Sequence, residues 1–186
     1  MLELLAPAGN LDAVIAAVQN GADAVYMGFG DGFNARRSAD NFTQESFAKA
    51  VRYCHIRGCK VYVTLNTLVG DREMDAAAAL AQQASDAGAD AILVQDLGLA
   101  RVLRAALPDI PLHASTQMSI HNLAGVEAAA EMGITRAVLA RELSLEQIRF
   151  ISQHASIETE VFVHGALCFC YSGQCYICLL YTSPSP

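Results

Sequence analysis

The chain has 186 residues, of which 53% are hydrophobic, and this is enough to bury the core of one domain. Its formal net charge of −7 argues against broad affinity for nucleic acid, DNA included, although it leaves room for a local basic site. No apolar stretch reaches the roughly 18 residues that span a bilayer, and the start of the chain lacks the basic flank of a signal peptide, so we expect a cytoplasmic protein without a membrane partner.

Short apolar strands and amphipathic helices are predicted to alternate along the chain. The expected strands are 2–5, 24–27, 61–65, 91–94, 111–114, 137–140 and 160–163. The expected helices are 11–20, 44–57, 72–87, 97–106, 122–132 and 145–154. Two segments, Gly21-Ala-Asp-Ala24 and Gly88-Ala-Asp-Ala91, support this register, because in each a glycine ends a helix and a strand begins three residues later. Residues 133–136 are a looser copy of the same step.

Short apolar strands separated by helices favour parallel pairing with the helices outside. Two architectures fit this order, a (β/α)₈ barrel and a doubly wound open sheet. The segment after the first strand, residues 6–10, reads Ala-Pro-Ala-Gly-Asn and lacks the Gly-x-Gly-x-x-Gly of dinucleotide-binding sheets. We therefore predict an α/β fold of the TIM-type (β/α)₈ barrel, truncated after about seven strands, since a complete barrel needs about 250 residues.

The end of the chain differs in character from the rest. Residues 177–186 show neither strand nor helix periodicity, and the segment ends in Ser-Pro-Ser-Pro. We interpret residues 1–176 as one incomplete barrel and residues 177–186 as a non-native tail that takes no part in the fold.

Polar side chains are predicted where the strands end, which is where barrel enzymes place their chemistry. Asn66 follows the third strand, Gln117 the fifth, Arg141 the sixth and His164 the seventh, and Arg36 lies in the long loop after the second. If they converge on one rim, they form a pocket for an anionic or carbonyl-rich ligand. Each alone could equally be a solvated loop residue or a helix cap.

Other polar residues have simpler interpretations. Asp96 is expected to cap the helix that follows it. Glu142 either pairs with its neighbour Arg141 or caps the helix that Ser144 opens.

Two cysteines, one histidine and two glutamates are also expected to be structural. Cys54 lies on the apolar side of a predicted helix, and Cys59 lies just before a predicted strand, so we expect both thiols to be buried and inert. His121 is expected at the surface. Glu158 and Glu160 are most simply polar residues at the entry to the last strand.

Three thiols, Cys168, Cys170 and Cys175, follow the turn Phe162-Val-His-Gly within a few positions. Cytosolic proteins rarely crowd cysteines in this way unless a metal, a cluster or thiol chemistry requires them. Together with Cys178 they suggest a four-thiolate site. A zinc ribbon, however, needs two separated Cys-x-x-Cys knuckles, and the one pair present depends on the tail set aside above.

The segment 162–175 resembles the signature of the peptidase U32 family, Phe-Val-His-Gly-Ala-Leu-Cys, a variable pair, then Tyr-Ser-Gly-Gln/Arg-Cys. Further family-like stretches are Leu-Ala-Pro-Ala-Gly at 5–9, Ala-Asp-Ala-Val-Tyr at 22–26, Phe-Asn-Ala-Arg at 33–36, Leu-Asn-Thr at 65–67, His-Ala-Ser-Thr-Gln at 113–117 and Leu-Ala-Arg-Glu-Leu-Ser at 139–144. The stretch 113–117 and the ending Gly-Gln-Cys-Tyr at 173–176 look closer to the ribosomal-RNA cytidine hydroxylase branch than to the tRNA-uridine or ubiquinone branches.

This resemblance implies an oxygen-independent hydroxylase with a [4Fe–4S] cluster, prephenate as the source of the hydroxyl group, and a base of structured ribosomal RNA as the acceptor. It assigns two cluster ligands to Cys168 and Cys175 and the other two to positions beyond residue 186. In this scheme Arg36 and Arg141 pair with the prephenate carboxylates. His164 is an acid/base or orienting group, with a structural histidine that bonds a loop carbonyl as the alternative.

A peptidase is the alternative function, since the family carries a collagenase-like label. Peptide hydrolysis needs an activated nucleophile with a base and an oxyanion site, or a metal-activated water. The sequence has no Gly-x-Ser-x-Gly and no His-Glu-x-x-His, and a pair of Cys168 and His164 has no evident third member to orient it. An RNA-binding scaffold without catalysis is disfavoured by the acidic charge.

Overall fold

The computed structural model describes residues 2–30, 32–35, 41–165 and 170–172. Seven parallel strands form one curved sheet, and each strand pairs with its neighbour in the sequence. The strands are β1 (Leu5–Pro7), β2 (Ala24–Gly28), β3 (Lys60–Leu65), β4 (Ala91–Val94), β5 (Leu112–Ala114), β6 (Arg136–Val138) and β7 (Glu158–Glu160). The helices are α1 (Leu11–Gln19), α2 (Gln44–His55), α3 (Met74–Asp86), α4 (Leu97–Ala106), α5 (Leu123–Glu131) and α6 (Leu145–His154), with a short 3₁₀ helix η1 (Thr116–Met118) after β5.

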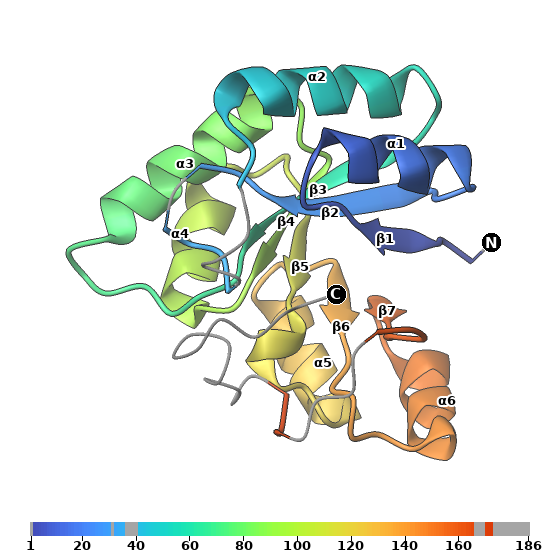
Figure 1. Ribbon diagram of the computed structural model, residues 1–186. Helices are drawn as coiled ribbons and strands as arrows, with labels where there is room; N and C mark the ends of the chain where they lie inside the picture. The colour runs from blue at the N-terminus through green and yellow to red at the C-terminus, as the bar shows by residue number, and fades with distance from the viewer. Residues whose placement is uncertain (1, 31, 36–40, 166–169, 173–186) are drawn as a thin grey trace.

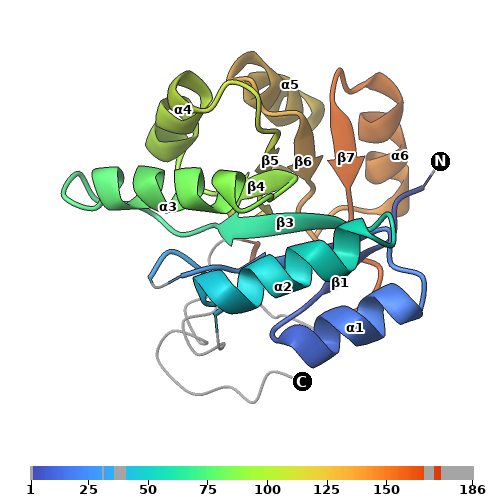
Figure 2. The ribbon, with the colours of Figure 1, turned by 90° about the horizontal axis from the view of Figure 1, so that it is seen from above.

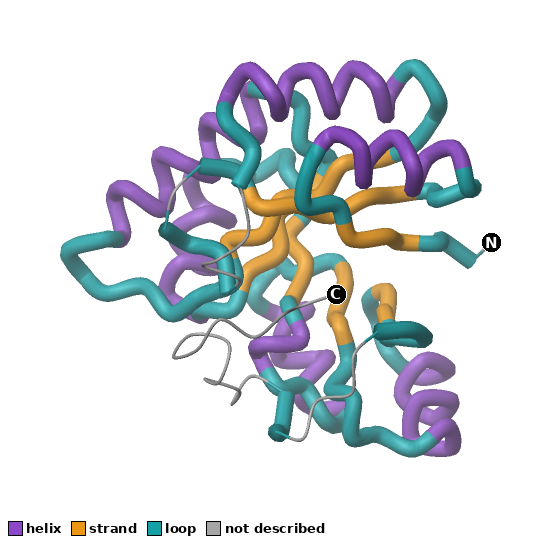
Figure 3. Tube along the Cα trace, in the orientation of Figure 1, coloured by secondary structure: helices purple, strands orange, loops and turns teal. Residues whose placement is uncertain are grey.

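The helices cover the outer face of the sheet, and the strands curve around a common interior (Figures 1 and 2). Figure 3 shows the same layering by element type, with the strands at the centre and the helices outside. The strands follow one another from β1 to β7 without a reversal of order. A doubly wound sheet would have such a reversal. The predicted α/β barrel architecture is therefore confirmed. Within the described residues the pairings run from β1–β2 to β6–β7, and none joins β1 to β7.

The repeated Gly-Ala-Asp-Ala step has the same structure at both places. Gly21 and Gly88 end their helices at φ values of +90° and +97°, which glycine adopts without strain. Each following aspartate then bonds the strand before it. The Asp23 carboxylate accepts from the Leu4 N–H at 2.8 Å, and the Asp90 carboxylate accepts from the Val61 N–H at 2.7 Å. The repeat thus sets the register of each new strand against its neighbour.

Side-chain hydrogen bonds cap the first turn of five of the six α-helices described. Asn10, Thr43, Asp96, Asn122 and Ser144 each accept a hydrogen bond from the first turn of the helix that follows. The prediction for Asp96 is confirmed, with the Leu99 N–H donating to it at 2.8 Å. The cap of α6 is a capping box between Ser144 and Gln147, so the proposed capping role of Glu142 was wrong.

The last strand differs from its prediction. The apolar run 161–163 is exposed, and the strand is formed instead by Glu158–Glu160, which pairs with β6 so that Arg136 lies opposite Glu158. Burial of Arg136 explains the difference, because this side chain is only 10% exposed and needs carboxylate partners. Glu158 and Glu160 therefore form the strand and partner Arg136. They are not the entry residues that we expected.

A charged layer lies at the amino-terminal ends of the strands, where Arg136 is nearly buried and Lys60 and Glu158 are exposed. We call this layer the basal network: Glu3, Lys60, Tyr62, Arg136, Glu158 and Glu160. Arg136 Nη1 lies 2.5 Å from Glu3 Oε1, and its Nη2 lies 2.6 Å from Glu158 Oε2. Burial would raise the pKa of Glu3, but the hydrogen bonds from Arg136, Tyr62 and Lys60 lower it to about 2.

The two cysteines that we expected to be inert, Cys54 and Cys59, are buried, as predicted. Cys54 is fully buried and Cys59 is 3% exposed. Burial raises the pKa of Cys54 to about 12 and raises that of Cys59 as well, so both thiols stay protonated and unreactive at neutral pH. Among the helices that the structure describes, none has the length and apolar content to span a membrane.

Candidate functional site

Three loops at the carboxyl-terminal end of the sheet meet around Ser115, which is buried directly after β5. Asn66, the first residue after β3, donates from Nδ2 to Ser115 Oγ at 3.2 Å and accepts from the Ala35 N–H at 3.1 Å. The Gln117 N–H also donates to Ser115 Oγ, at 3.3 Å. Two of the predicted site residues, Asn66 and Gln117, are therefore brought to one place.

The loop after β2 folds closely over the end of its own strand. Asn34 Nδ2 donates to Asn41 Oδ1 at 3.1 Å, directly above Gly28. A Cβ at position 28 would lie 2.1 Å from Asn41 Oδ1, so only glycine leaves room for this pair. The loop thereby brings Ala35 to Asn66. Arg36, the next residue in the sequence, lies outside the described part of the chain.

A second cluster at the same end of the sheet surrounds Ser172, which is fully buried. Its N–H donates to Glu142 Oε1 at 2.6 Å, and its Oγ accepts from the Arg141 backbone N–H at 3.1 Å and from Arg141 Nε at 3.3 Å. Its carbonyl oxygen accepts from the Ser119 hydroxyl. All three polar groups of Ser172 are thus held by residues that follow β5 and β6.

His121 links the two loops that hold Ser172. Its Nδ1 lies 2.5 Å from the Ser119 carbonyl oxygen, and its Nε2 lies 3.3 Å from Glu142 Oε2. Ser119 has a φ of 56°, and it is the one non-glycine residue with positive φ in the described chain. Such left-handed backbone costs roughly 1 kcal/mol or more for a residue with a side chain and is often found at functional sites.

The electrostatics of this cluster centre on Glu142, whose side chain is 28% exposed. Partial burial raises the pKa of Glu142, but hydrogen bonds from its own backbone and from Ser172, with His121 nearby, outweigh burial and hold the pKa below its usual value. Glu142 is therefore an anion at neutral pH. The alternatives for Glu142, an ion pair with Arg141 or a helix cap, do not match these contacts.

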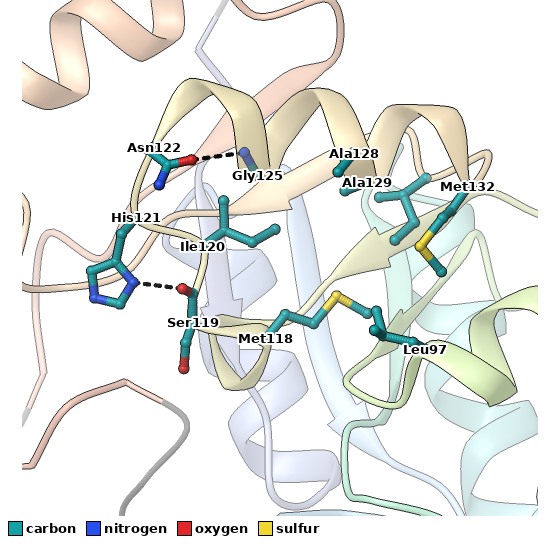
Figure 4. A pocket seen from close by; sticks show the side chains of 11 residues that line it. Leu97, Met118, Ser119, Ile120, His121, Asn122, Gly125, Ala128, Ala129 and Met132 are labelled. Carbon is teal, nitrogen blue, oxygen red and sulfur yellow. Dashed lines mark hydrogen bonds between the residues drawn. The ribbon is translucent and has the colours of Figure 1, made fainter.

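A cavity of about 340 Å³ lies beside this cluster, between α4 and α5. Ser119, His121 and Asn122 line one end of it, and Leu97, Met118, Ala129 and Met132 line the other (Figure 4). The lining is mainly apolar, with polar groups at the end nearest the Ser172 cluster. Sequence reasoning did not find this cavity, because its walls come from two helices and the η1 loop.

The remaining predicted residues are placed as follows. Arg141 lies in the Ser172 cluster through its backbone N–H and Nε, and no hydrogen bond between described residues involves its two Nη groups. His164 is exposed, four positions after the end of β7. Cys168 and Cys175 lie outside the described residues, as does Cys178.

The donor chemistry of the chain suits an iron–sulfur cluster better than a hard cation. Thiolates are the ligands of such clusters, and Cys168 and Cys175 are thiols that follow the strand ends in sequence. No group of three or more His, Cys, Asp or Glu side chains in the described part of the chain could hold a metal.

Ser119, His121 and Glu142 are the residue types of a hydrolytic triad, but their connections differ from it. In a triad the histidine accepts the proton of the serine hydroxyl. Here His121 Nδ1 faces the Ser119 carbonyl oxygen, and the Ser119 hydroxyl donates to the Ser172 carbonyl. Among the described residues, the Ser119 hydroxyl therefore meets no base that would activate it.

Sequence comparison identifies the family. The model of peptidase family U32 matches residues 9–185. The chain belongs to this family. A solved structure of a U32 peptidase, Mk0906, superposes with a TM-score of 0.74 at 19% sequence identity, over 91% of this chain and 71% of that one. At this identity the likeness supports the barrel fold alone.

Curated relatives of this U32 chain are named either for RNA hydroxylation or for proteolysis. The chain is 46% identical over 176 residues to a 23S rRNA 5-hydroxycytidine synthase of Escherichia coli, which covers 95% of the chain and 26% of that protein. It is 38% identical to the tRNA hydroxylation protein P of Escherichia coli, over 94% of the chain and 39% of that protein. It is 34% identical to a collagenase of Porphyromonas gingivalis, over 95% of the chain and 45% of that protein. The chain thus spans between a quarter and a half of the length of these relatives.

Proposed function

We propose that this U32 chain is part of an oxygen-independent hydroxylase that replaces a C–H of a ribosomal-RNA base with C–OH and takes the hydroxyl group from prephenate. The observation that carries the proposal is the 46% identity to a 23S rRNA 5-hydroxycytidine synthase. That value exceeds the 41% and 38% found for two tRNA hydroxylation proteins and the 34% found for the collagenase. The arrangement at the carboxyl end of the barrel supports it.

In this proposal Arg36 and Arg141 bind the two carboxylates of prephenate. Arg141 is suited to this role because Ser172 fixes its Nε while its planar fork keeps two further nitrogens to donate. Asn66 supplies a side-chain amide beside Ser115, and Gln117, whose backbone N–H donates to Ser115, is proposed to supply a second amide; both groups can hydrogen-bond a carbonyl-rich ligand or the edge of a base. His164, which is exposed and precedes Cys168 by four residues in the sequence, is proposed to move a proton.

Cys168 and Cys175 are proposed to hold a [4Fe–4S] cluster together with two ligands from outside this chain. When bound, such a cluster supplies electron transfer and Lewis acidity that protein side chains lack. The buried, protonated thiols Cys54 and Cys59 take no part in this proposal.

The test uses a protein that carries this chain at the full length of its curated relatives. It is purified without oxygen, and iron, sulfide and visible absorption are measured for the parent, Cys168→Ala, Cys175→Ala and the matched control Cys54→Ala. We expect Cys168→Ala and Cys175→Ala to lose the chromophore and Cys54→Ala to keep it. Ribosomal RNA from cells with and without the protein is then digested, and nucleosides heavier by one oxygen are counted. A colourless parent that leaves the RNA unchanged contradicts the proposal.

Peptide hydrolysis is the second candidate, and the relative named collagenase is what favours it. The contacts of Ser119 and His121 do not assemble a nucleophile with its base, which argues against it. The same preparations decide between the two functions. A colourless parent that cleaves peptide, and that no longer does so as Cys168→Ala, would establish the peptidase.

A further inference from the structure

We propose that His113 is a ligand-binding residue inside the barrel and that its imidazole hydrogen-bonds an uncharged oxygen of prephenate. This role rests on the proposed function for the identity of the ligand. It extends the candidate site from the Ser115 cluster down along β5, to a side chain that the proposed function does not use.

The His113 side chain points into the barrel. Its neighbours on β5, Leu112 and Ala114, belong to the core that packs against the helices. Side chains alternate along a strand, so His113 and Ser115 face the other side of the sheet. There the ring of His113 packs edge-on against that of Tyr62, with 4.9 Å between their centroids. Tyr62 lies in a core cluster whose members all come from strands, as expected of a barrel interior.

His113 is buried without a hydrogen-bond partner in the described part of the chain. The residue is 4% exposed, and its Nδ1 atom is among the buried polar atoms that no donor or acceptor meets there. A neutral imidazole has one N–H donor and one acceptor nitrogen, and buried groups of this kind are nearly always paired with protein or water. Ser115 also has a donor left, because its Oγ accepts from Asn66 and Gln117 and no hydrogen bond among the described residues uses its own proton. Both side chains thus have polar groups left for a ligand.

A row of inward-facing residues around His113 retains some exposed area. Thr64 pairs with Leu93, and Leu93 pairs with His113, so the three lie side by side on β3, β4 and β5. They are 5%, 6% and 4% exposed. On the outer face of the same sheet, Ile92 and Leu112 are fully buried. Side chains therefore do not fill the interior completely at this row, and an atom of a ligand can reach it.

The depth of His113 suits a ligand of the size of one substituted ring. Each residue advances a strand by about 3.3 Å, so His113 lies about 6.6 Å below Ser115, the next residue on the same face. A substituted cyclohexadiene ring, such as that of prephenate, spans a similar length. One ligand can therefore contact the Ser115 cluster and His113 together.

The charges near His113 favour an uncharged group of the ligand. Arg136, its neighbour on β6, already pairs with Glu3 and Glu158. A further carboxylate, that of Glu160, lies 3.6 Å from the same guanidinium. A ligand carboxylate here would add another anion to this layer, whereas the ketone or hydroxyl oxygen of prephenate needs only the imidazole N–H. Burial, followed by the charge of Arg136, lowers the pKa of His113 to about 3, so the imidazole is uncharged at neutral pH.

Calorimetric titration of the full-length protein with prephenate, in the absence of RNA, tests this role without turnover. His113→Phe keeps a ring against Tyr62 but offers no hydrogen bond. His113→Asn carries its amide on Cγ, the atom that bears Nδ1 in histidine, and keeps a donor and an acceptor there. The matched control His154→Phe removes an exposed imidazole on α6.

We expect His113→Phe to raise the Kd for prephenate about tenfold, the factor that corresponds to one lost hydrogen bond to a buried oxygen. His113→Asn should stay within about threefold of the parent, and His154→Phe should match it. Rescue by asparagine distinguishes a lost hydrogen bond from a change of shape. An unchanged Kd in His113→Phe, or equal rises in His113→Phe and His113→Asn, overturns this role. If His113→Phe does not fold, His113→Leu replaces it with the same expected rise.

Binding of prephenate by the parent separates this role from the proposed function. A parent that binds no prephenate overturns prephenate as the source of the hydroxyl group and, with it, the role of His113. A parent that binds prephenate with the same affinity as His113→Phe overturns the role of His113 alone and leaves the proposed function standing.

Discussion

The two ends of the barrel use buried polar groups in different ways. At the amino-terminal end, the basal network joins residues of the strands and of the segment before β1, and its groups are mainly charged. At the carboxyl-terminal end, the Ser115 and Ser172 clusters join loop residues, and most of their bonds involve neutral hydroxyl, amide and backbone groups. Both ends contain long-range contacts, but they connect different parts of the fold.

This difference matches the roles that barrel ends usually have. Charges buried against strands cannot move without disturbing the sheet, so the basal network contributes to stability and register. Loops can change without disturbing the sheet, and hydrogen bonds among them place reactive side chains. Variants at the two ends should therefore separate stability from function, and the following predictions test that separation.

Replacement of Arg136 should have the largest effect. Arg136→Met removes the cation that Glu160 faces and leaves Glu3 with Lys60, and removal of one partner from a buried ion pair costs about 3–5 kcal/mol. We expect urea unfolding of this chain to show a loss in this range. Arg101→Met, at an exposed position on α4, is the control and should change stability little. A loss below about 1 kcal/mol for Arg136→Met would show that the network is not a source of stability.

His113 should make the amino-terminal end sensitive to acid. Burial, followed by the charge of Arg136, lowers the pKa of His113 to about 3 from its usual 6.5. Its side chain is 4% exposed, and among the described residues its Nδ1 atom has no hydrogen-bond partner. The unfolded chain then binds a proton below pH 6.5 that the folded chain does not bind, so stability falls as pH falls from 6.5 toward 3. Between pH 6 and 5 we expect a slope near 1.4 kcal/mol per pH unit from this group.

His113→Phe and His113→Gln remove this proton site, and both should flatten the stability profile between pH 6.5 and 4.5. Glu3 serves as the internal contrast. Its pKa is lowered from 4.5 to about 2, so its contribution is present above pH 4.5 and is lost only as pH falls toward 2. If the slope persists in both His113 variants, another group is responsible.

The amino-terminal and carboxyl-terminal ends of the barrel also differ in how much of their structure could be predicted from the sequence. Strand and helix order followed from apolar periodicity, and the Asp96 cap and the buried Cys54 followed from their immediate neighbours. The register of β7 did not, because it depends on Glu158 meeting Arg136, which lies 22 residues earlier in the chain. An apolar run is a stronger local signal than two glutamates, so the strand was predicted two residues too late.

At the carboxyl-terminal end, sequence located the candidate region but missed much of its support. Asn66, Gln117 and Arg141 were found because each lies shortly after a strand, Asn66 directly after β3 and the other two three residues after β5 and β6. Ser172 was missed because its partners Glu142 and Ser119 lie 30 and 53 residues away in the sequence. His121 was missed because it contacts the same two partners. The family-like stretch Tyr-Ser-Gly-Gln contains Ser172 and was the one sequence signal for it. The roles of Arg36, His164, Cys168 and Cys175 stay predictions.

Asn66→Ala should reduce activity more than stability, whereas the main effect of Arg136→Met should be on stability. It removes the partner of the Ala35 N–H and of Ser115 Oγ, which costs about 1–2 kcal/mol of stability. The full-length protein should still fold, because Asn66 lies in a loop, yet its yield of hydroxylated RNA should fall at least about tenfold if Asn66 orients a ligand. Asn66→Asp retains an acceptor for Ala35 and should recover stability more than activity. Full activity in Asn66→Ala would remove Asn66 from the site.

Tyr62→Phe should give the smallest effect and sharpen the account of the basal network. The Tyr62 hydroxyl donates to Glu3 Oε1 at 2.8 Å, but Glu3 keeps Arg136 and Lys60 as partners when that hydroxyl is lost. The ring, which packs edge-on against His113 at 4.9 Å, also remains. A single neutral donor removed from a carboxylate that stays paired should cost about 1 kcal/mol, well below the loss for Arg136→Met. If Tyr62→Phe instead costs as much as Arg136→Met, the hydroxyl and not the guanidinium determines the ionisation of Glu3, and the pH at which acid unfolding begins should rise in Tyr62→Phe as well.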